Sequence, residues 1–161
     1  MSKPKIYLES SIFNFPFADD APQYRDEAKI LFRLIGEGNF DPYTSVYTIE
    51  EIDLTEDAGK RAKLKAQVYD YGVKILQPND EVRQLAGIYL AERAVKASYP
   101  TDALHIAITT VYGLDCIISM NFQHIVRRTT IEKVDKINTR EGYRRIGIYF
   151  PAEVIYDEEN S

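Results

Sequence analysis

Short apolar segments alternate with longer helical segments along most of this chain, and this alternation constrains the fold more than any other feature. The segments expected to form strands are residues 5–8, 40–45, 73–76, 116–119 and 147–150. Strand, helix and strand in succession produce parallel strands whose connecting helices cover both faces of the sheet. We therefore predict an α/β fold, a three-layer α/β/α sandwich around a central, mainly parallel sheet of four to five strands.

Apolar residues at helical spacing and turn residues mark where the helices lie. The helices expected are 23–35, one that begins at 46, 56–71, one that begins near 80, and 100–112. Ser45 is a possible N-cap of the second helix, and Asn79 or Asp80 caps the fourth. The helix 100–112 is apolar nearly all round, which places it in the interior. Residues 10–16 are expected to form a turn.

The length of 161 residues fits one domain over 1–161, with a core of about 4–150 and a frayed tail at 157–161. No uncharged apolar stretch approaches 18 residues, and the N-terminus does not resemble a signal peptide, so we expect no membrane partner. The single cysteine, Cys116, lies in an apolar run and indicates a core residue in a reducing compartment, with the cytoplasm as the expected location.

The net charge of −5 argues against broad electrostatic binding of nucleic acid. It does not exclude nucleic acid, because acids gathered around a metal also lower the net charge.

Four polar residues from distant parts of the sequence are expected to meet at one edge of the sheet. Glu9 ends the first strand, and Glu51 lies in the helix that leaves the second strand. Asp102 begins the helix that leads into the fourth strand, and Asn121 follows that strand. Ligands of such sheets bind at the carboxyl ends of the strands. Carboxylates brought together there repel one another, and hard oxygen ligands suit Mg²⁺ or Mn²⁺, which can activate water and clamp a phosphodiester.

Each of these residues also has a purely structural interpretation. Glu9 could simply end a strand, and Glu51 could be a solvated helix residue while its neighbour Glu50 is the functional one. Asp102 could cap its helix, and Asn121 could serve a turn. These interpretations explain the residues one by one but not their convergence.

Four segments in order resemble PIN domains, the fold of the VapC-type toxin ribonucleases. The segments are Ile6-Tyr-Leu-Glu-Ser-Ser11, Thr44-Ser45 followed by Glu51-Ile52, Asp102-Ala-Leu-His-Ile-Ala107, and Ile117-Ile-Ser-Met-Asn-Phe122. The resemblance covers about residues 4–126 and implies metal-dependent cleavage of RNA. It implies catalytic roles for Glu9, Glu51, Asp102 and Asn121, with the first three as ligands of Mg²⁺ or Mn²⁺. It also implies a homodimer and a cognate antitoxin as partner.

The chain departs from the family pattern at two of these positions. The family usually has Asp where this chain has Glu9, and an acid where this chain has Asn121. The site then carries at most three formal negative charges. Two readings stay open beside a ribonuclease: a non-catalytic or weakly active module that binds RNA or protein, and another metal-dependent phosphoryl-transfer enzyme. Against the latter, there is neither an Asp-x-Asp pair after the first strand nor a Gly-rich phosphate loop.

Further residues are candidates for supporting roles. Ser11 lies where the family often has a small hydroxyl residue, and Ser119 lies in the last matched segment. His105 shares a helix face with Asp102 and either orients a ligand, contacts substrate or is a hydrogen-bonded packing residue. His124 could approach the acids from the segment after Asn121. The arginine pairs 127–128 and 144–145 could bind phosphate, although such pairs are more often solvated surface.

Overall fold

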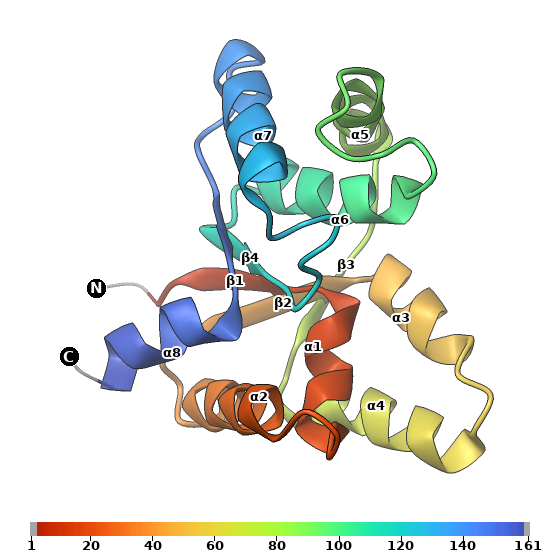
Figure 1. Cartoon of the computed structure of the whole chain (residues 1–161), viewed down its shortest axis with the longest axis vertical. Coiled ribbons are helices and arrows are strands. Elements are labelled where there is room, and N and C mark those ends of the chain that lie inside the picture. Colours follow the sequence, from red (N-terminus) through yellow and green to blue (C-terminus); the bar gives the residue numbers. More distant parts are fainter. Residues whose placement is uncertain (1–2, 160–161) are drawn as a thin grey trace.

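A sheet of five parallel strands runs through the middle of the molecule (Figure 1). The computed structural model describes residues 3–159, and of residues 157–159 it describes only the backbone. The strands are β1 (Lys5–Leu8), β2 (Asp41–Ser45), β3 (Lys74–Leu76), β4 (Cys116–Ile118) and β5 (Gly147–Tyr149). Their order is β3-β2-β1-β4-β5, and every neighbouring pair is parallel. The prediction of an α/β fold with a mainly parallel sheet is confirmed, and β1 is its central strand.

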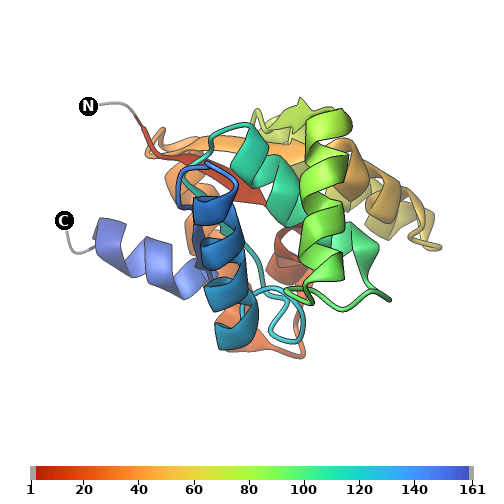
Figure 2. The same cartoon turned by 90° about the horizontal axis from the view of Figure 1, so that it is seen from above.

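Helices cover both faces of this sheet, which confirms the three-layer arrangement (Figures 1 and 2). One face packs against α5 (Asp80–Ala91), α6 (Pro100–Val111) and α7 (Arg128–Arg140). The other face packs against α1 (Ser10–Asn14), α2 (Pro22–Gly36), α3 (Val46–Asp53), α4 (Ala58–Asp70) and α8 (Pro151–Glu159). Alternate residues of β1 serve the two cores, because Tyr7 faces the first layer while Ile6 and Leu8 face the second.

The helix signals in the sequence correspond to contacts in the structure. The Ser45 hydroxyl accepts a hydrogen bond from the Tyr47 amide at 3.2 Å, and Asn79 Oδ1 accepts one from the Val82 amide at 2.8 Å. Of the two possible caps of α5, the structure therefore has Asn79. The helix α6 lies in the interior, and all its residues from 105 to 110 are buried.

The structure differs from the sequence-based expectation in three segments. The turn predicted over residues 10–16 is wrong, because α1 forms there and a 3₁₀ helix, Phe15–Phe17, follows it. The sequence-based expectation contains no helix over 128–140, where α7 forms. At the C-terminus α8 continues to Glu159, so the first part of the expected frayed tail is helical, and residues 160–161 lie outside the described chain. Ile155 anchors α8 in the second core with none of its surface exposed.

Cys116 is a buried core residue, as its apolar neighbours predicted. Burial raises the pKa of its thiol to about 12, so the thiol stays protonated at neutral pH. Among the described residues, no helix combines the length and the apolarity needed to cross a bilayer.

Candidate metal centre

The carboxyl ends of the central strands bring the polar residues of the matched segments to one edge of the sheet. Glu9 directly follows β1, and Ser45 ends β2 and leads into α3, which carries Glu51. Ser119 directly follows β4, and Asp102 lies in the first turn of α6, whose N-terminus is at the same edge. Parallel strands share one carboxyl edge, so the convergence follows from the topology.

The Glu9 carboxylate is held by hydroxyl groups on both of its oxygens. It accepts hydrogen bonds from Ser10 Oγ, Ser11 Oγ and Ser119 Oγ, each at 2.6 Å, and from the Ser11 amide at 3.2 Å. Only 4% of the surface of Glu9 is exposed. The bond from the Ser11 amide also makes Glu9 the N-cap of α1, which explains why a helix begins here.

Ser10 lies between two carboxylates, although nothing in the sequence beyond its place beside Glu9 pointed to it. Its hydroxyl is 2.6 Å from Glu9 Oε2 and 3.0 Å from Glu51 Oε2. A hydroxyl has one proton and can donate fully to only one of them at a time. The two carboxylates therefore share one donor, and their repulsion at this point is only partly compensated.

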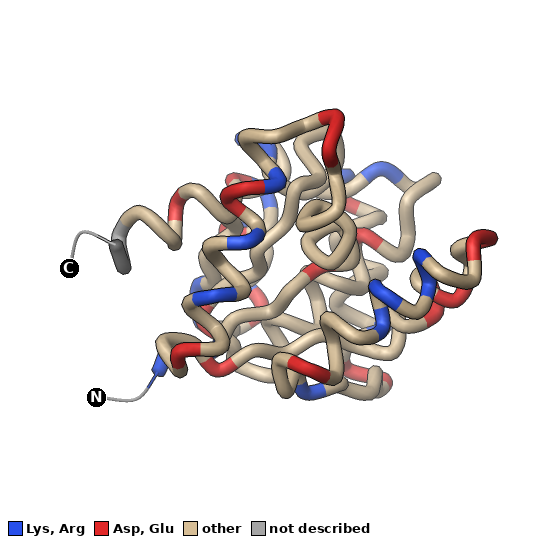
Figure 3. Tube along the Cα trace, turned by 90° about the horizontal axis from the view of Figure 1, so that it is seen from below, with Lys and Arg blue, Asp and Glu red and all other residues tan. Residues whose placement is uncertain are grey.

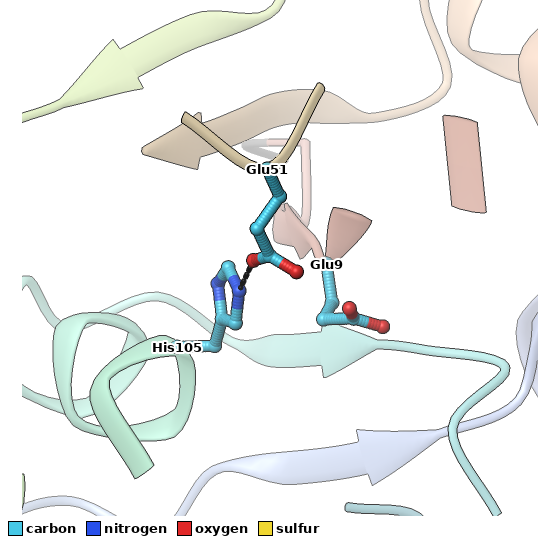
Figure 4. Close-up of side chains that lie close together, drawn as sticks. All are labelled: Glu9, Glu51 and His105. Carbon is cyan, nitrogen blue, oxygen red and sulfur yellow. Dashed lines mark hydrogen bonds and ion pairs between the residues drawn. The ribbon is translucent and has the colours of Figure 1, made fainter. Parts of the chain in front are cut away.

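His105 is completely buried and makes a hydrogen bond through each ring nitrogen. Nε2 lies 2.7 Å from Glu51 Oε1 (Figure 4), and Nδ1 lies 2.5 Å from the Tyr7 hydroxyl. The Tyr7 hydroxyl in turn lies 2.7 Å from Ser45 Oγ. We assign the proton to Nε2 because the chain from Ser45 through Tyr7 to His105 and Glu51 then satisfies every group without a charge on the ring. Of the three interpretations of His105, the hydrogen-bonded packing residue is confirmed, and a role in orienting a ligand or contacting substrate stays a prediction.

The Glu51 side chain points from α3 toward both His105 and Glu9, and 41% of it is exposed (Figure 4). Burial would raise its pKa, but the hydrogen bonds from His105 and Ser10 outweigh that effect and lower it. Burial likewise would lower the pKa of His105, and its bond to Glu51 outweighs this and raises it. Ligand atoms of Glu9, Glu51 and His105 all lie within 4.8 Å of one another, which is close enough to hold a metal ion.

Asp102 is not one of these three residues, but their charges affect the pKa of its carboxyl. Burial, together with the charges of Glu9 and Glu51, raises the pKa of its carboxyl to about 6. His105 and a hydrogen bond from the Asn121 side chain oppose the shift only partly. Burial and the neighbouring charges therefore disfavour the ionised form of Asp102, whereas the donors around Glu51 favour its ionised form.

Asn121 has its amide oxygen engaged in the turn after β4. Oδ1 accepts hydrogen bonds from the Gln123 amide at 3.2 Å and the His124 amide at 3.0 Å. The Asn121 side chain also lies near enough to Asp102 to lower the pKa of its carboxyl slightly. The turn interpretation of Asn121 is thus correct, and its side chain lines the pocket.

An open pocket of about 440 Å³ lies in front of these groups, and Glu9, Glu51 and Asn121 line it. Lys60 of α4 lines the same pocket, which no motif in the sequence indicated. It belongs to a basic stretch of α4, visible at the right of Figure 3. A positive side chain beside the acids gives the pocket a group that could contact a phosphate.

His124 lies away from this pocket. Its ring stacks on Tyr99 with 3.8 Å between centroids, and it lines a separate small cavity with Lys96 and Arg127. Only its backbone amide reaches the site, through the bond to Asn121.

The remaining arginines of the two pairs lie in ion pairs at the surface. Their partners are Glu132 for Arg128, Asp115 for Arg144 and Asp135 for Arg145. More than half of each arginine side chain is exposed, which agrees with their interpretation as solvated surface.

No model of a known protein family matches the chain, and no curated protein matches it. The resemblance to PIN domains therefore stands on the residues of its four segments.

Proposed function

We propose that this protein is a metal-dependent endoribonuclease with a PIN-like site at the carboxyl edge of the sheet. The observation that supports this most is the closeness of Glu9 and Glu51, which both line an open pocket, with Asp102 near enough to sense the charges of both. The pair Glu9 and Glu51 shares one hydroxyl proton, and the pKa of Asp102 is raised to about 6 by burial and by the charges of its neighbours. Acids are seldom placed so close together without a cation to compensate them.

The donor set suits a hard divalent ion. Glu9, Glu51 and Asp102 offer carboxylate oxygens, which Mg²⁺ and Mn²⁺ prefer. In this proposal His105 orients Glu51 rather than binding the ion, because its ring is fully buried and its Nε2 already bonds Glu51. Bound Mg²⁺ or Mn²⁺ would supply an activated water and neutralise charge on the phosphodiester.

The chain's own side chains would position the substrate. Lys60 extends into the pocket from α4, where it could bind a phosphate of single-stranded RNA. The three serine hydroxyls on Glu9 fix its longer side chain, so that the extra methylene relative to Asp need not loosen the site.

The resemblance further supports a toxin that acts in the cytoplasm as a homodimer and pairs with a cognate antitoxin. The free, buried thiol of Cys116 agrees with a reducing compartment.

Cleavage of a labelled single-stranded RNA in Mg²⁺ or Mn²⁺ tests the proposal. We expect Glu51→Gln and Asp102→Asn each to reduce the rate at least about a hundredfold, by analogy with the loss of one electrostatic group from a catalytic site. Glu50→Gln is the matched control, because Glu50 is the exposed neighbour of Glu51 on α3, and it should cleave like the natural protein. Equal cleavage by the natural protein and Asp102→Asn would show that the activity comes from a contaminant.

A second candidate function is a non-catalytic module that binds RNA or protein. It is favoured by the four hydrogen bonds on Glu9 and by the engaged oxygen of Asn121, which satisfy these groups without a metal. Under this reading the double variant Glu9→Asp, Asn121→Asp should gain metal binding that the natural protein lacks. Tight binding of Mn²⁺ by the natural protein would rule it out.

A further inference from the structure

A second pocket, walled by aromatic rings, lies on the other side of the segment that follows β4. Tyr24, Phe122 and Phe150 line this aromatic pocket, together with Met120 and Glu27, and its volume is about 180 Å³. The rings of Tyr24 and Phe122 are 5.6 Å apart, and those of Phe122 and Phe150 are 4.4 Å apart. Tyr24 is 40% exposed and Phe122 is 42% exposed, so the cluster offers aromatic surface to a ligand.

The aromatic pocket shares a wall with the open pocket that Glu9 and Glu51 line, which we call the acidic pocket. Met120 and Phe122 line the aromatic pocket, while Asn121 between them lines the acidic pocket. Consecutive Cα atoms are about 3.8 Å apart, so the two pockets are separated by one thickness of chain.

Glu27 gives the aromatic pocket an acceptor that no donor of the described residues occupies and that solvent can reach. Only 6% of its surface is exposed, and within the described part of the chain its carboxylate has no hydrogen-bond or ion-pair partner. A carboxylate has two acceptor oxygens and no proton to donate. A ligand with two adjacent N–H donors on a flat ring would satisfy both oxygens while stacking on the aromatic wall.

We propose that the aromatic pocket binds a guanine base of single-stranded RNA, next to the phosphodiester at the candidate metal centre. This inference rests on the proposed ribonuclease function. Aromatic stacking does not discriminate between bases, so the specificity for one base depends on Glu27. Guanine presents two neighbouring N–H donors on its Watson–Crick edge, whereas adenine presents one amino donor beside an acceptor nitrogen. The carboxylate of Glu27 therefore favours guanine over adenine.

Binding of the labelled pentamers UUGUU and UUAUU, measured in EDTA, tests this assignment. EDTA prevents metal-dependent cleavage, so the result does not depend on whether the protein is a nuclease. We expect the natural protein to bind UUGUU about tenfold more tightly, within the range for a bidentate base contact. Glu27→Gln should abolish most of this preference, because a glutamine amide can pair bidentately with the edge of adenine as well as with that of guanine.

Two further variants separate stacking from base choice. Phe122→Leu should weaken binding of both pentamers and keep the guanine preference. Tyr69→Leu is the matched control, because Tyr69 is 61% exposed on α4 and lines neither pocket, and it should bind both pentamers unchanged.

Equal affinity of the natural protein for the two pentamers, or no binding of either at millimolar concentration, overturns the proposal without reference to any variant. Displacement of a bound pentamer by N-acetyl-arginine amide but not by guanosine overturns it too, and assigns the pocket to a cationic side chain of a protein partner. Metal-dependent cleavage without a guanine preference would leave the ribonuclease proposal intact and remove only this one. Guanine binding without cleavage would support this proposal and remove the ribonuclease proposal.

Discussion

Two hydrogen-bonded networks in this molecule are each built around a fully buried tyrosine, and they end differently. Tyr89 of α5 hydrogen-bonds Asn138 of α7 and, at 3.2 Å, Thr110 of α6. Asn138 Nδ2 also donates to Thr110 Oγ1 at 3.2 Å, so this network closes on itself among neutral groups. Tyr7, in contrast, hydrogen-bonds His105, which in turn hydrogen-bonds the Glu51 carboxylate at the pocket.

The network around Tyr89 fixes how helices pack, whereas the network around Tyr7 positions a charged group at the surface. Tyr89, Asn138 and Thr110 are all buried, and they tie three helices of one layer together. Glu51, at the end of the other network, is 41% exposed. Both networks satisfy buried polar atoms, but only the one at the sheet edge holds a charged group where a ligand can reach it.

The largest effect on stability is expected from Asn138→Ala. The substitution removes one hydrogen-bond partner each from the Tyr89 hydroxyl and from Thr110, which still bond each other, and opens a small cavity. We expect the free energy of unfolding to fall by about 2–3 kcal/mol, measured by urea denaturation. Affinity for Mn²⁺ should not change, and a change would show that the two networks are coupled.

The opposite sign is expected from Asp102→Asn in the presence of EDTA. The pKa of Asp102 is about 6 in the fold, mainly because of burial and then because of Glu9, and is near 3.9 in the unfolded chain. The folded state then binds more protons between these values, so the natural protein loses stability as pH rises through that range. After a discount for the partial exposure of Asp102, we expect the substitution to add about 1–2 kcal/mol of stability above pH 6.

The gain should disappear below about pH 4, where the carboxyl is protonated in both states. Unfolding curves of the two proteins between those pH values check this. A loss of stability in Asp102→Asn at neutral pH would mean that the carboxylate is well compensated without a metal.

A smaller effect, on the metal alone, is expected from His105→Gln. The substitution removes the ring that orients Glu51 but keeps all three proposed carboxylate ligands. We expect the affinity for Mn²⁺ to fall about tenfold, as for other residues that position a ligand. Asn138→Ala serves as the control for general loosening of the fold, and an equal loss of affinity in both variants would deny His105 its positioning role.

No change is expected from Arg128→Ala, whose side chain is 90% exposed in its ion pair with Glu132. Exposed pairs of this kind contribute little to stability. Both the urea midpoint and the Mn²⁺ affinity should match those of the natural protein, and a clear shift in either would place Arg128 in a network that its contacts do not reveal.

The fold could be predicted from the sequence because its signals are local. All strands but β2 are largely apolar runs, and most helices have apolar residues at regular spacing with caps such as Ser45. The short helix α1 could not be predicted because its N-cap is Glu9, a residue type that rarely caps helices, and its five residues are too few to show a helical period. The helix α7 could not be predicted because its sequence is largely polar and carries few apolar residues, among them Val134 and Ile137.

The position of the site could be predicted, but its internal contacts could not. Topology alone brings Glu9, Glu51 and Asp102 to one edge, since parallel strands share their carboxyl ends. The proton that Ser10 shares between two carboxylates and the bond from Tyr7 to His105 depend on side-chain conformations across distant segments. No periodicity in the sequence carries that information.

Calorimetric titration with Mn²⁺ measures whether a divalent cation binds at the sheet edge. The natural protein and Asp102→Asn are titrated side by side at pH 7.5, where the carboxyl of the natural protein is ionised. We expect a saturable single-site isotherm for the natural protein and an affinity at least about tenfold lower for Asp102→Asn. The absence of saturable heat in the natural protein, or identical isotherms for the two, would contradict the claim.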